Sequence, residues 1–131
     1  MNDCHSKSEI ASRFMQALQD AERTGQVAEL TAFFAEDAEL RNLSRHESRR
    51  GREGAQEFWG NYLTAFRQVR STFTQVLEGQ DHAVLEWTSE GLLPDEHPVC
   101  YRGVSLLQWR DGQVTRFHTY YDSAALVAVR Q

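Results

Sequence analysis

The sequence has few cysteines and few prolines. Its 131 residues include two cysteines, Cys4 and Cys100, which are far apart and belong to no Cys-x-x-Cys pair. Disulfide-rich secreted domains and structural zinc sites need more closely grouped cysteines, so we expect two free thiols. The two prolines, Pro94 and Pro98, bracket residues 95–97. Because proline cannot donate a hydrogen bond to a sheet ladder, this spacing predicts a loop between two strands.

Long apolar runs are also missing. No window approaches the roughly 20 apolar residues that a membrane-spanning helix needs. The first ten residues lack the apolar core of a signal peptide. These absences predict a soluble, cytoplasmic protein.

Positive charge is in the minority. The chain has 14 Lys and Arg residues against 19 Asp and Glu residues, which gives a net charge of -5. An acidic surface repels phosphate backbones, so we expect no nucleic-acid partner. The one basic run, residues 45–52, is interrupted by Glu47 and followed by Glu53. We interpret it as a solvated loop.

The motifs of several cofactor and catalytic classes are absent. The five histidines show neither His-x-His nor His-x-x-x-His spacing, so we expect no metal site. The chain has no glycine-rich phosphate loop and no Gly-x-Ser-x-Gly elbow. We therefore expect no bound cofactor.

The first half of the chain has helical periodicity. Apolar residues at Ile10, Phe14, Leu18 and Ala21 predict a helix that begins at Ser8 and ends at Gly25. A short helix over residues 27–34 and a strand over residues 35–43 follow. A third helix over residues 55–69 carries an aromatic stripe that suits either the core or a pocket wall. This stripe consists of Phe58, Trp59, Tyr62, Leu63 and Phe66.

The second half has strand character. Strands are predicted over residues 71–79, 82–93, 99–109 and 113–122, and a short helical segment over residues 123–129 closes the chain. Helices first and strands last predict an α+β fold, in which a curved antiparallel sheet wraps over three helices and encloses a pocket. We expect a flexible tail over residues 1–7 and a single domain over residues 8–131.

The faces of two central strands follow from the loop between them. A four-residue loop over residues 94–97 would set Leu93 opposite Pro98. Side chains alternate along a strand, so this register gathers one set of residues on the pocket face: Glu86, Thr88, Glu90, Tyr101, Ser105, Leu107 and Trp109. The opposite face gathers a second set, which we expect to pack against another subunit in a homodimer: Leu85, Trp87, Cys100, Arg102, Val104 and Leu106.

Glutamates on an apolar pocket face are the main chemical indication. Burial raises the pKa of a carboxyl group toward the range in which a general acid or base works. We therefore select Glu90 as the candidate catalytic residue. The alternative is that Glu86 and Glu90 pair with arginines or face solvent.

The direction of His118 depends on the turn at Asp111 and Gly112. A two-residue primed turn would bring His118 opposite Ser105 on the pocket face. A type I turn with Gly112 as a left-handed bulge would place Phe117 and Thr119 there instead. We favour the bulge.

Three segments carry a resemblance to a known family: FFAEDAEL (33–40), GREGAQEFWGNY (51–62) and YRGVSLLQWRDGQVTRFHTYYDSAAL (101–126). Over about residues 8–128, the chain resembles the SnoaL-like and ketosteroid-isomerase-like branch of the nuclear transport factor two superfamily. The resemblance implies a cone-shaped fold with a deep apolar pocket, commonly as a dimer. This fold hosts isomerases, cyclases, dehydratases, epoxide hydrolases and proteins without catalytic activity.

The resemblance gives few catalytic residues. Asn42 stands where ketosteroid isomerases have their general-base aspartate, and Ser105 stands where they have a protonated carboxylic acid. Their tyrosine on the first helix falls near Phe14 or Leu18, so the steroid-isomerase mechanism is not expected. The polyketide cyclases' catalytic acid has no clear counterpart at Phe117 or Thr119.

Limonene epoxide hydrolases provide a partial match. Asn42 matches the asparagine that holds the attacking water, and Glu90 replaces one aspartate of the Asp-Arg-Asp set. The other members of their water-activating apparatus are replaced by Thr88, Thr119 and Leu40. Half of that apparatus is therefore missing.

The sequence leads to two functional hypotheses. In the first, the cone binds a small hydrophobic molecule, Glu90 moves a proton, and Asn42 and Tyr101 orient the substrate or a water. In the second, the same fold is a non-catalytic ligand-binding or dimerisation module. The predicted substrate-binding residues are Phe14, Leu18, Trp59, Tyr62, Phe66, Glu86, Thr88, Tyr101, Ser105, Trp109, Phe117 and Thr119.

Overall fold

The computed structural model describes residues 2–126, with side chains for residues 9–126. The helices in this part of the chain are α1 (Asn2–Thr24), α2 (Ala28–Thr31), α3 (Gly51–Thr64) and the 3-10 helix η1 (Ser123–Leu126). The strands are β1 (Phe34–Asn42), β2 (Glu47–Arg50), β3 (Gln68–Glu78), β4 (His82–Leu92), β5 (Pro98–Arg110) and β6 (Gln113–Tyr121). They form one sheet in the order β2-β1-β6-β5-β4-β3.

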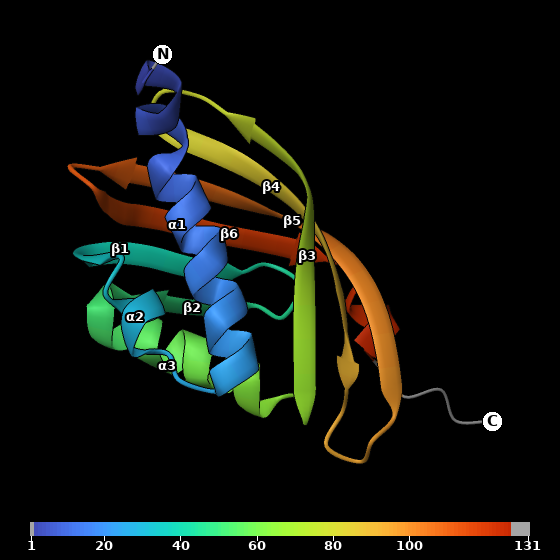
Figure 1. Ribbon diagram of the computed structural model, residues 1–131. Helices are drawn as coiled ribbons and strands as arrows, with labels where there is room; N and C mark the ends of the chain where they lie inside the picture. Colours follow the sequence, from blue (N-terminus) through green and yellow to red (C-terminus); the bar gives the residue numbers. More distant parts are fainter. Residues whose placement is uncertain (1, 127–131) are drawn as a thin grey trace.

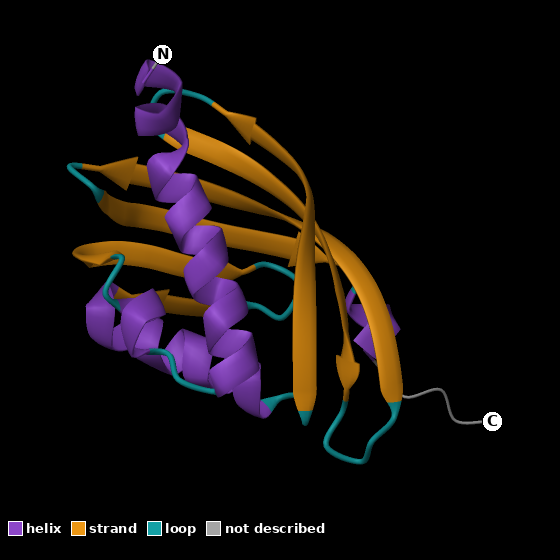
Figure 2. Cartoon of the chain, in the orientation of Figure 1, coloured by secondary structure: helices purple, strands orange, loops and turns teal. Residues whose placement is uncertain are grey.

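The sheet is strongly curved, and α1, α2 and α3 cover its concave face (Figures 1 and 2). α1 packs on β3, whereas α3 packs on β1 and β2. This arrangement confirms the predicted α+β fold. One detail of the prediction is wrong, because β1 and β6 pair in parallel and the sheet is therefore mixed. The meander from β3 to β6 brings β6 beside β1 in the same direction.

The helix limits differ from those predicted. α1 begins at Asn2, before the predicted start at Ser8. Gly25 ends it as expected, since its φ is 80° and its amide donates to the Ala21 carbonyl at 2.7 Å. α3 spans Gly51–Thr64 rather than residues 55–69. The division into a tail of residues 1–7 and a domain from residue 8 stays a prediction, and residues 127–129 of the predicted last helix lie outside the described residues.

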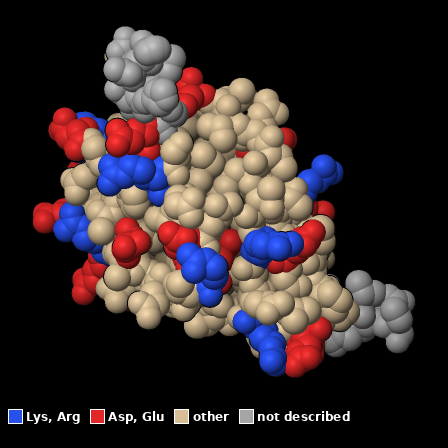
Figure 3. Space-filling view, in the orientation of Figure 1, with Lys and Arg blue, Asp and Glu red and all other residues tan. Residues whose placement is uncertain are grey.

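Part of the basic run forms a strand, so its interpretation as a loop is wrong. β2 (Glu47–Arg50) pairs with β1 at the edge of the sheet. Arg49 lies 3.3 Å from the Glu47 carboxylate and 3.1 Å from that of Glu57. These acidic neighbours balance its charge. On the face drawn in Figure 3, basic and acidic side chains are likewise interspersed.

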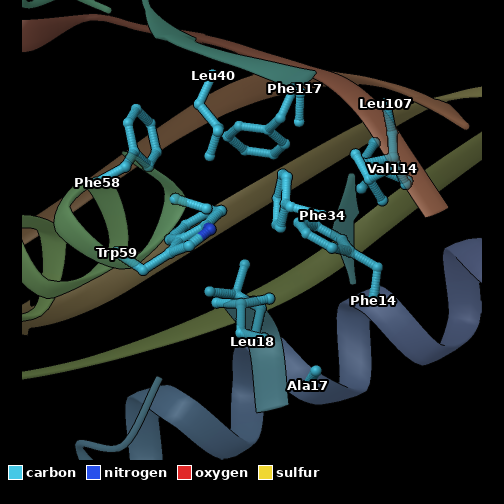
Figure 4. Close-up of a cluster of buried hydrophobic side chains, with 14 of the residues drawn as sticks. Phe14, Ala17, Leu18, Phe34, Leu40, Phe58, Trp59, Leu107, Val114 and Phe117 are labelled. Atoms are coloured by element: carbon cyan, nitrogen blue, oxygen red, sulfur yellow. The ribbon is translucent and has the colours of Figure 1, made fainter. Parts of the chain in front are cut away.

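Aromatic side chains pack against one another in the main core (Figure 4). Phe58 and Trp59 come from α3, Phe14 comes from α1, and Phe117 comes from β6. Trp59 lies 5.0 Å from both Phe58 and Phe117 between ring centroids, and Phe14 lies 5.5 Å from Phe117. Burying an aromatic side chain of this size contributes about 1.5–3 kcal/mol, so this cluster holds the helices to the sheet.

In the described part of the chain, no helix has both the length and the apolar character to cross a membrane.

The loop between β4 and β5 is one residue shorter than predicted. Leu93 lies opposite His97, because its amide donates to the His97 carbonyl at 2.9 Å, and Glu96 in between has a φ of 70°. The ladder therefore pairs Leu92 with Pro98 and Leu85 with Ser105. Odd-numbered residues of β4 therefore lie on the same face of the sheet as odd-numbered residues of β5. The concave face of β4 carries Leu85, Trp87 and Ser89, and the predicted facing of this strand is wrong.

The hairpin between β5 and β6 combines features of both predicted turns. Arg110 pairs with Gln113 across a two-residue turn, in which Asp111 and Gly112 have φ values of 55° and 80°. The register then shifts between Gln108 and Trp109. This bulge brings Thr119 opposite Ser105, so Phe117 and Thr119 face the helices. The favoured facing is correct, although the bulge lies within the strands rather than at the turn.

Candidate functional site

A cavity of about 510 Å³ lies between the helices and the concave face of the sheet. Its wall is mainly aromatic and aliphatic, with a few polar groups. The apolar and aromatic wall residues are Phe14, Leu18, Phe58, Trp59, Tyr62, Ala65, Phe66, Phe73, Leu85, Trp87, Leu93, Tyr101, Phe117, Tyr121 and Leu126. The polar and charged ones are Asn42, Ser44, Arg45, Glu47, Ser71, Ser89, Ser105, Thr119 and Ser123.

The structure brings most of the predicted site residues to this wall. They are Asn42, Phe14, Leu18, Trp59, Tyr62, Phe66, Tyr101, Ser105, Phe117 and Thr119. Their roles in binding or catalysis stay predictions. Glu86, Thr88, Glu90 and Trp109 do not line the cavity.

Glu90 lies on the convex face, away from the helices. Its side chain is 61% exposed, and its carboxylate is 3.3 Å from the Arg70 guanidinium. The neighbouring Glu86 is also exposed and accepts a hydrogen bond from Thr74 at 3.2 Å. The predicted placement of both carboxylates in the pocket is therefore wrong. The alternative was that these glutamates pair with arginines or face solvent, and this describes their surroundings.

Thr88 and Trp109 are displaced from the cavity for different reasons. Thr88 shares the parity of Glu86 and Glu90, so the shorter loop sends it to the convex face. Trp109 has the inward parity, but it packs against the main core and lines a separate polar groove beside Asp37 and Arg110. It lies beyond the part of β5 that borders the cavity.

The predicted dimer face also changes. Leu85 is fully buried and Trp87 is 8% exposed inside the domain. Neither side chain reaches the convex face, so their predicted part in an interface is wrong. The convex-face positions on β5 keep the predicted set of Cys100, Arg102, Val104 and Leu106.

Asn42 fixes the end of β1. Its side-chain oxygen accepts hydrogen bonds from the amides of Ser44 and Arg45, at 3.1 and 3.2 Å. Its amide nitrogen donates to the Tyr121 hydroxyl at 2.9 Å. The acceptor that would hold a water is therefore engaged by the backbone, and Asn42 positions Tyr121 at the cavity wall.

A buried polar chain crosses three strands at Ser105. Its hydroxyl accepts a hydrogen bond from the Trp87 indole at 2.9 Å and lies 2.9 Å from the Thr119 hydroxyl. Trp87, Ser105 and Thr119 come from β4, β5 and β6 and are all buried. The chain joins neighbouring strands along the cavity wall.

A second polar cluster surrounds Glu22, which the sequence interpretation missed. Glu22 lies on α1, and its carboxylate accepts hydrogen bonds from the Tyr62 hydroxyl at 2.6 Å and from the Ser71 hydroxyl at 2.6 Å. The Ser71 amide donates to the same carboxylate at 2.8 Å. Ser71 continues to Ser89, whose hydroxyl is 2.7 Å away. Tyr62, Ser71 and Ser89 line the cavity, so this cluster adds a polar section to its wall.

The ionisation of this cluster is shifted. Burial raises the pKa of the Glu22 carboxyl, and the hydrogen bonds from Ser71 and Tyr62 oppose that rise. Burial also raises the pKa of Tyr62 well above its ordinary value, and the charge of Glu22 adds to that effect. The pKa of Tyr101 is raised by burial, then by Tyr121 and Glu22. Both tyrosines therefore stay protonated at neutral pH.

A sequence signal for Glu22 existed. It continues the helical stripe of Phe14 and Leu18 at a spacing of four residues. A charged residue on a buried helical face needs partners, because an unpaired buried charge is unfavourable. Its partners, Tyr62 and Ser71, come from α3 and β3, and no local pattern in the sequence links them to α1.

Three solved structures have the same fold. An NTF2-like protein from Anabaena variabilis superposes with a TM-score of 0.81 at 19% identity, over 91% of each chain. A hypothetical protein with a ketosteroid isomerase-like fold from Catenulispora acidiphila, in complex with trimethylamine, has a TM-score of 0.78 at 20% identity, over 86% of this chain and 87% of that chain. A putative SnoaL-like polyketide cyclase from Shewanella putrefaciens has a TM-score of 0.78 at 14% identity, over 92% of this chain and 93% of that chain.

The sequence comparison gives the family. No curated protein matches the chain. The family model described as a SnoaL-like domain matches residues 11–117, which include all of α2, α3 and β1 to β5. Together with the cone-like fold around the cavity, this match shows that the chain belongs to the SnoaL-like domain family.

Proposed function

We propose that the protein binds a small, largely apolar molecule in the cavity between α1, α3 and the sheet. The observation that carries this proposal is the cavity itself, with a volume of about 510 Å³ and a wall rich in aromatic side chains. Small-molecule sites typically measure about 300–1,000 Å³ and combine apolar walls with a few polar groups. The hydroxyl groups of Ser71, Ser89 and Ser105 supply such polar groups.

We favour a ligand-binding function over a catalytic role of Glu90. That carboxylate is exposed and paired with Arg70, so it has neither the burial nor the position of a general acid in the cavity. Asn42 uses its side-chain oxygen to hold the backbone of residues 44 and 45. The proposal therefore follows the ligand-binding alternative and assigns no proton transfer to Glu90 or Asn42.

Naphthalene is a suitable first probe, because it is rigid, apolar and smaller than the cavity. We expect saturating naphthalene to raise the midpoint of thermal unfolding of the wild-type protein, because a ligand that binds the folded state alone stabilises it. Isothermal titration calorimetry gives the affinity. Failure of naphthalene and similar bicyclic compounds to bind would overturn the proposal.

A matched pair of variants locates the binding site. Ala65 lines the cavity and caps α3, whereas Ala32 is exposed and caps α2 in a similar backbone conformation. We expect Ala65→Trp to fill part of the cavity and weaken naphthalene binding. Ala32→Trp makes the same exchange away from the cavity and keeps the affinity. If Ala65→Trp keeps the same affinity as Ala32→Trp, naphthalene binds elsewhere.

We also propose that the convex face pairs two copies of the chain. Leu106 and Tyr120 on this face are 36% and 44% exposed, and Val104 lies next to them in the ladder. Light scattering tests this proposal. We expect the wild type to have twice the mass of one chain and Leu106→Glu to have the mass of one chain, with Ala32→Glu as the control. A monomeric wild type would overturn it.

A further inference from the structure

The hydrogen bonds around Glu22 have a fixed direction. In its ionised form, the Glu22 carboxylate only accepts hydrogen bonds, which is the direction of its bonds with the Tyr62 and Ser71 hydroxyls. Its Oε2 lies 2.6 Å from both the Tyr62 hydroxyl and the Ser71 hydroxyl, and its Oε1 lies 2.8 Å from the Ser71 amide. Tyr62 and Ser71 each have a single hydroxyl hydrogen. Both hydrogens therefore point at Glu22.

This direction extends to the cavity. Since the Ser71 hydrogen points at Glu22, the bond of 2.7 Å between the two serine hydroxyls must be donated by Ser89 and accepted by Ser71. Ser89 then offers only oxygen lone pairs to the cavity, as does Tyr62. The wall formed by Tyr62, Ser71 and Ser89 is thus a hydrogen-bond acceptor. We refer to these three residues as the acceptor wall.

Tyr101 lies opposite Ser89 in the ladder between β4 and β5 and also lines the cavity. It is 5% exposed, and burial raises the pKa of its hydroxyl, so it adds no charge to the cavity.

The charge around the cavity disfavours an anion at this wall. Glu22 lies directly behind the acceptor wall, and the positive side chain among the described lining residues, Arg45, follows the end of β1 and is exposed. A carboxylate or phenolate placed against lone pairs and a nearby carboxylate would be repelled. A neutral group with a hydrogen to donate fits both the charge and the hydrogen-bond direction.

We infer that the cavity selects neutral molecules with an apolar, ring-shaped body and one O–H or N–H group that donates to the acceptor wall. In this inference, Glu22 is a positioning residue, because it acts through Tyr62 and Ser71 and does not touch the ligand. The inference rests on the proposed binding function and adds the class of ligand to it.

Three naphthalenes of similar size test the inference by isothermal titration calorimetry. 2-Naphthol can donate and accept, 2-methoxynaphthalene can only accept, and 2-methylnaphthalene can do neither. We expect 2-naphthol to bind wild-type protein about tenfold more tightly than 2-methylnaphthalene, the ratio that one net hydrogen bond produces. 2-Methoxynaphthalene has no hydrogen to donate to the acceptor wall, so we expect it to bind less tightly than 2-naphthol.

Replacing Glu22 by glutamine turns the acceptor wall into a hydrogen-bond donor. If the new amide oxygen keeps the Ser71 amide, its nitrogen stands where Oε2 was and has two hydrogens for the oxygens of Tyr62 and Ser71. The Tyr62 and Ser89 hydrogens are then free to point into the cavity. We expect Glu22→Gln to lose the preference for 2-naphthol over 2-methoxynaphthalene. A purely structural role of Glu22 would weaken all three ligands equally.

Two further variants complete the experiment. Glu90→Gln makes the same exchange on the convex face, and we expect it to keep the wild-type preference. Ser71→Ala interrupts the link between Glu22 and Ser89, and it serves as a second test if Glu22→Gln does not fold. Circular dichroism of each variant establishes folding before the titrations.

The outcomes separate the two proposals. If none of the three naphthalenes binds, the binding function itself is wrong. If wild-type protein binds all three equally, or prefers 2-methoxynaphthalene, the cavity binds small molecules but the donor rule is wrong. If both Glu22→Gln and Ser71→Ala keep the preference for 2-naphthol, the assigned role of Glu22 is wrong.

Discussion

The hydroxyl of Ser105 lies 2.9 Å from the indole nitrogen of Trp87, and this contact joins β4 to β5 at the cavity wall. Ser105→Ala leaves the buried indole N–H without its acceptor, so we expect the free energy of unfolding to fall by about 1–3 kcal/mol. Urea denaturation measures the change. Ser48→Ala, at an exposed position of β2, is the control and should change stability by less than about 0.5 kcal/mol.

Gly103 makes room for the Trp87 indole. A β-carbon at residue 103 would meet the Cζ2 atom of Trp87 and lie 2.5 Å from the carbonyl oxygen of Tyr120. We expect Gly103→Ala to lower the free energy of unfolding by about 1–3 kcal/mol through overpacking. Denaturation of the double variant with Trp87→Leu gives the coupling. A double variant whose loss equals the sum of the two single losses would show that the indole is not the obstacle.

The stability of the protein should depend on pH through Glu22. Tyr62 from α3, Ser71 from β3 and Tyr101 from β5 surround this carboxyl, and burial raises its folded-state pKa. A raised pKa means that its stabilising contribution is complete below the unfolded-state pKa and is lost as the pH rises through the folded-state value. Glu22→Gln has no such proton. We therefore expect the stability of the wild type, relative to Glu22→Gln, to fall as the pH rises.

Denaturation in urea at a series of pH values, from acidic to neutral, measures this difference. Glu90→Gln shows how much of the dependence comes from removing any carboxylate. The difference between wild type and Glu22→Gln is the informative quantity, because it cancels the titration of the other groups. A difference that is constant over the whole range would contradict the prediction.

Glu96 adopts a left-handed backbone conformation, with a φ of 70°. Asparagine tolerates this conformation better than glutamate does. We expect Glu96→Asn to raise the free energy of unfolding by up to about 1 kcal/mol, reduced by the loss of the exposed ion pair with Arg67. Thermal unfolding compares it with Asp95→Asn in the same loop. A decrease in stability greater than that of an Arg67→Gln variant would contradict the prediction.

The fold class could be predicted from the sequence because it depends on long, regular patterns. The stripe of Phe14 and Leu18 marks a helical face, and the alternation in residues 99–109 marks a half-buried strand. These patterns extend over several turns or pairs of residues. The parallel pairing of β1 with β6 depends on where distant segments meet, which no local pattern contains.

The facing of β4 shows where the sequence becomes ambiguous. Leu93 is apolar and follows Leu92, so the composition does not mark the last paired residue of the strand. The sequence fits a three-residue loop, which pairs Leu93 with His97, or a four-residue loop, which pairs Leu93 with Pro98. The choice between them reverses the facing of every side chain of β4. The alternation of Leu85, Glu86 and Trp87 carried the correct signal, because charged side chains are rarely buried.

The acceptor wall could not be predicted from the sequence alone. Glu22 and Ser71 are separated by 49 positions, and their contact depends on the way α1 crosses β3. Tyr62 carries an aromatic ring that suits a core, and its hydroxyl points at Glu22 only because α3 lies beside α1 in the folded chain. Hydrogen-bond direction is a property of the assembled cluster.

The tight loop between Leu93 and His97 has a consequence for how this cavity can change during evolution. Point substitutions alter one side chain of its lining at a time. A single inserted residue in that loop, if the strands kept their length, would shift the register of β4 by one residue. The face of β4 that carries Glu86 and Glu90 would then point toward the helices. Insertions and deletions at this hairpin therefore provide a way to replace Leu85, Trp87 and Ser89 in the lining with Glu86, Thr88 and Glu90 in one step.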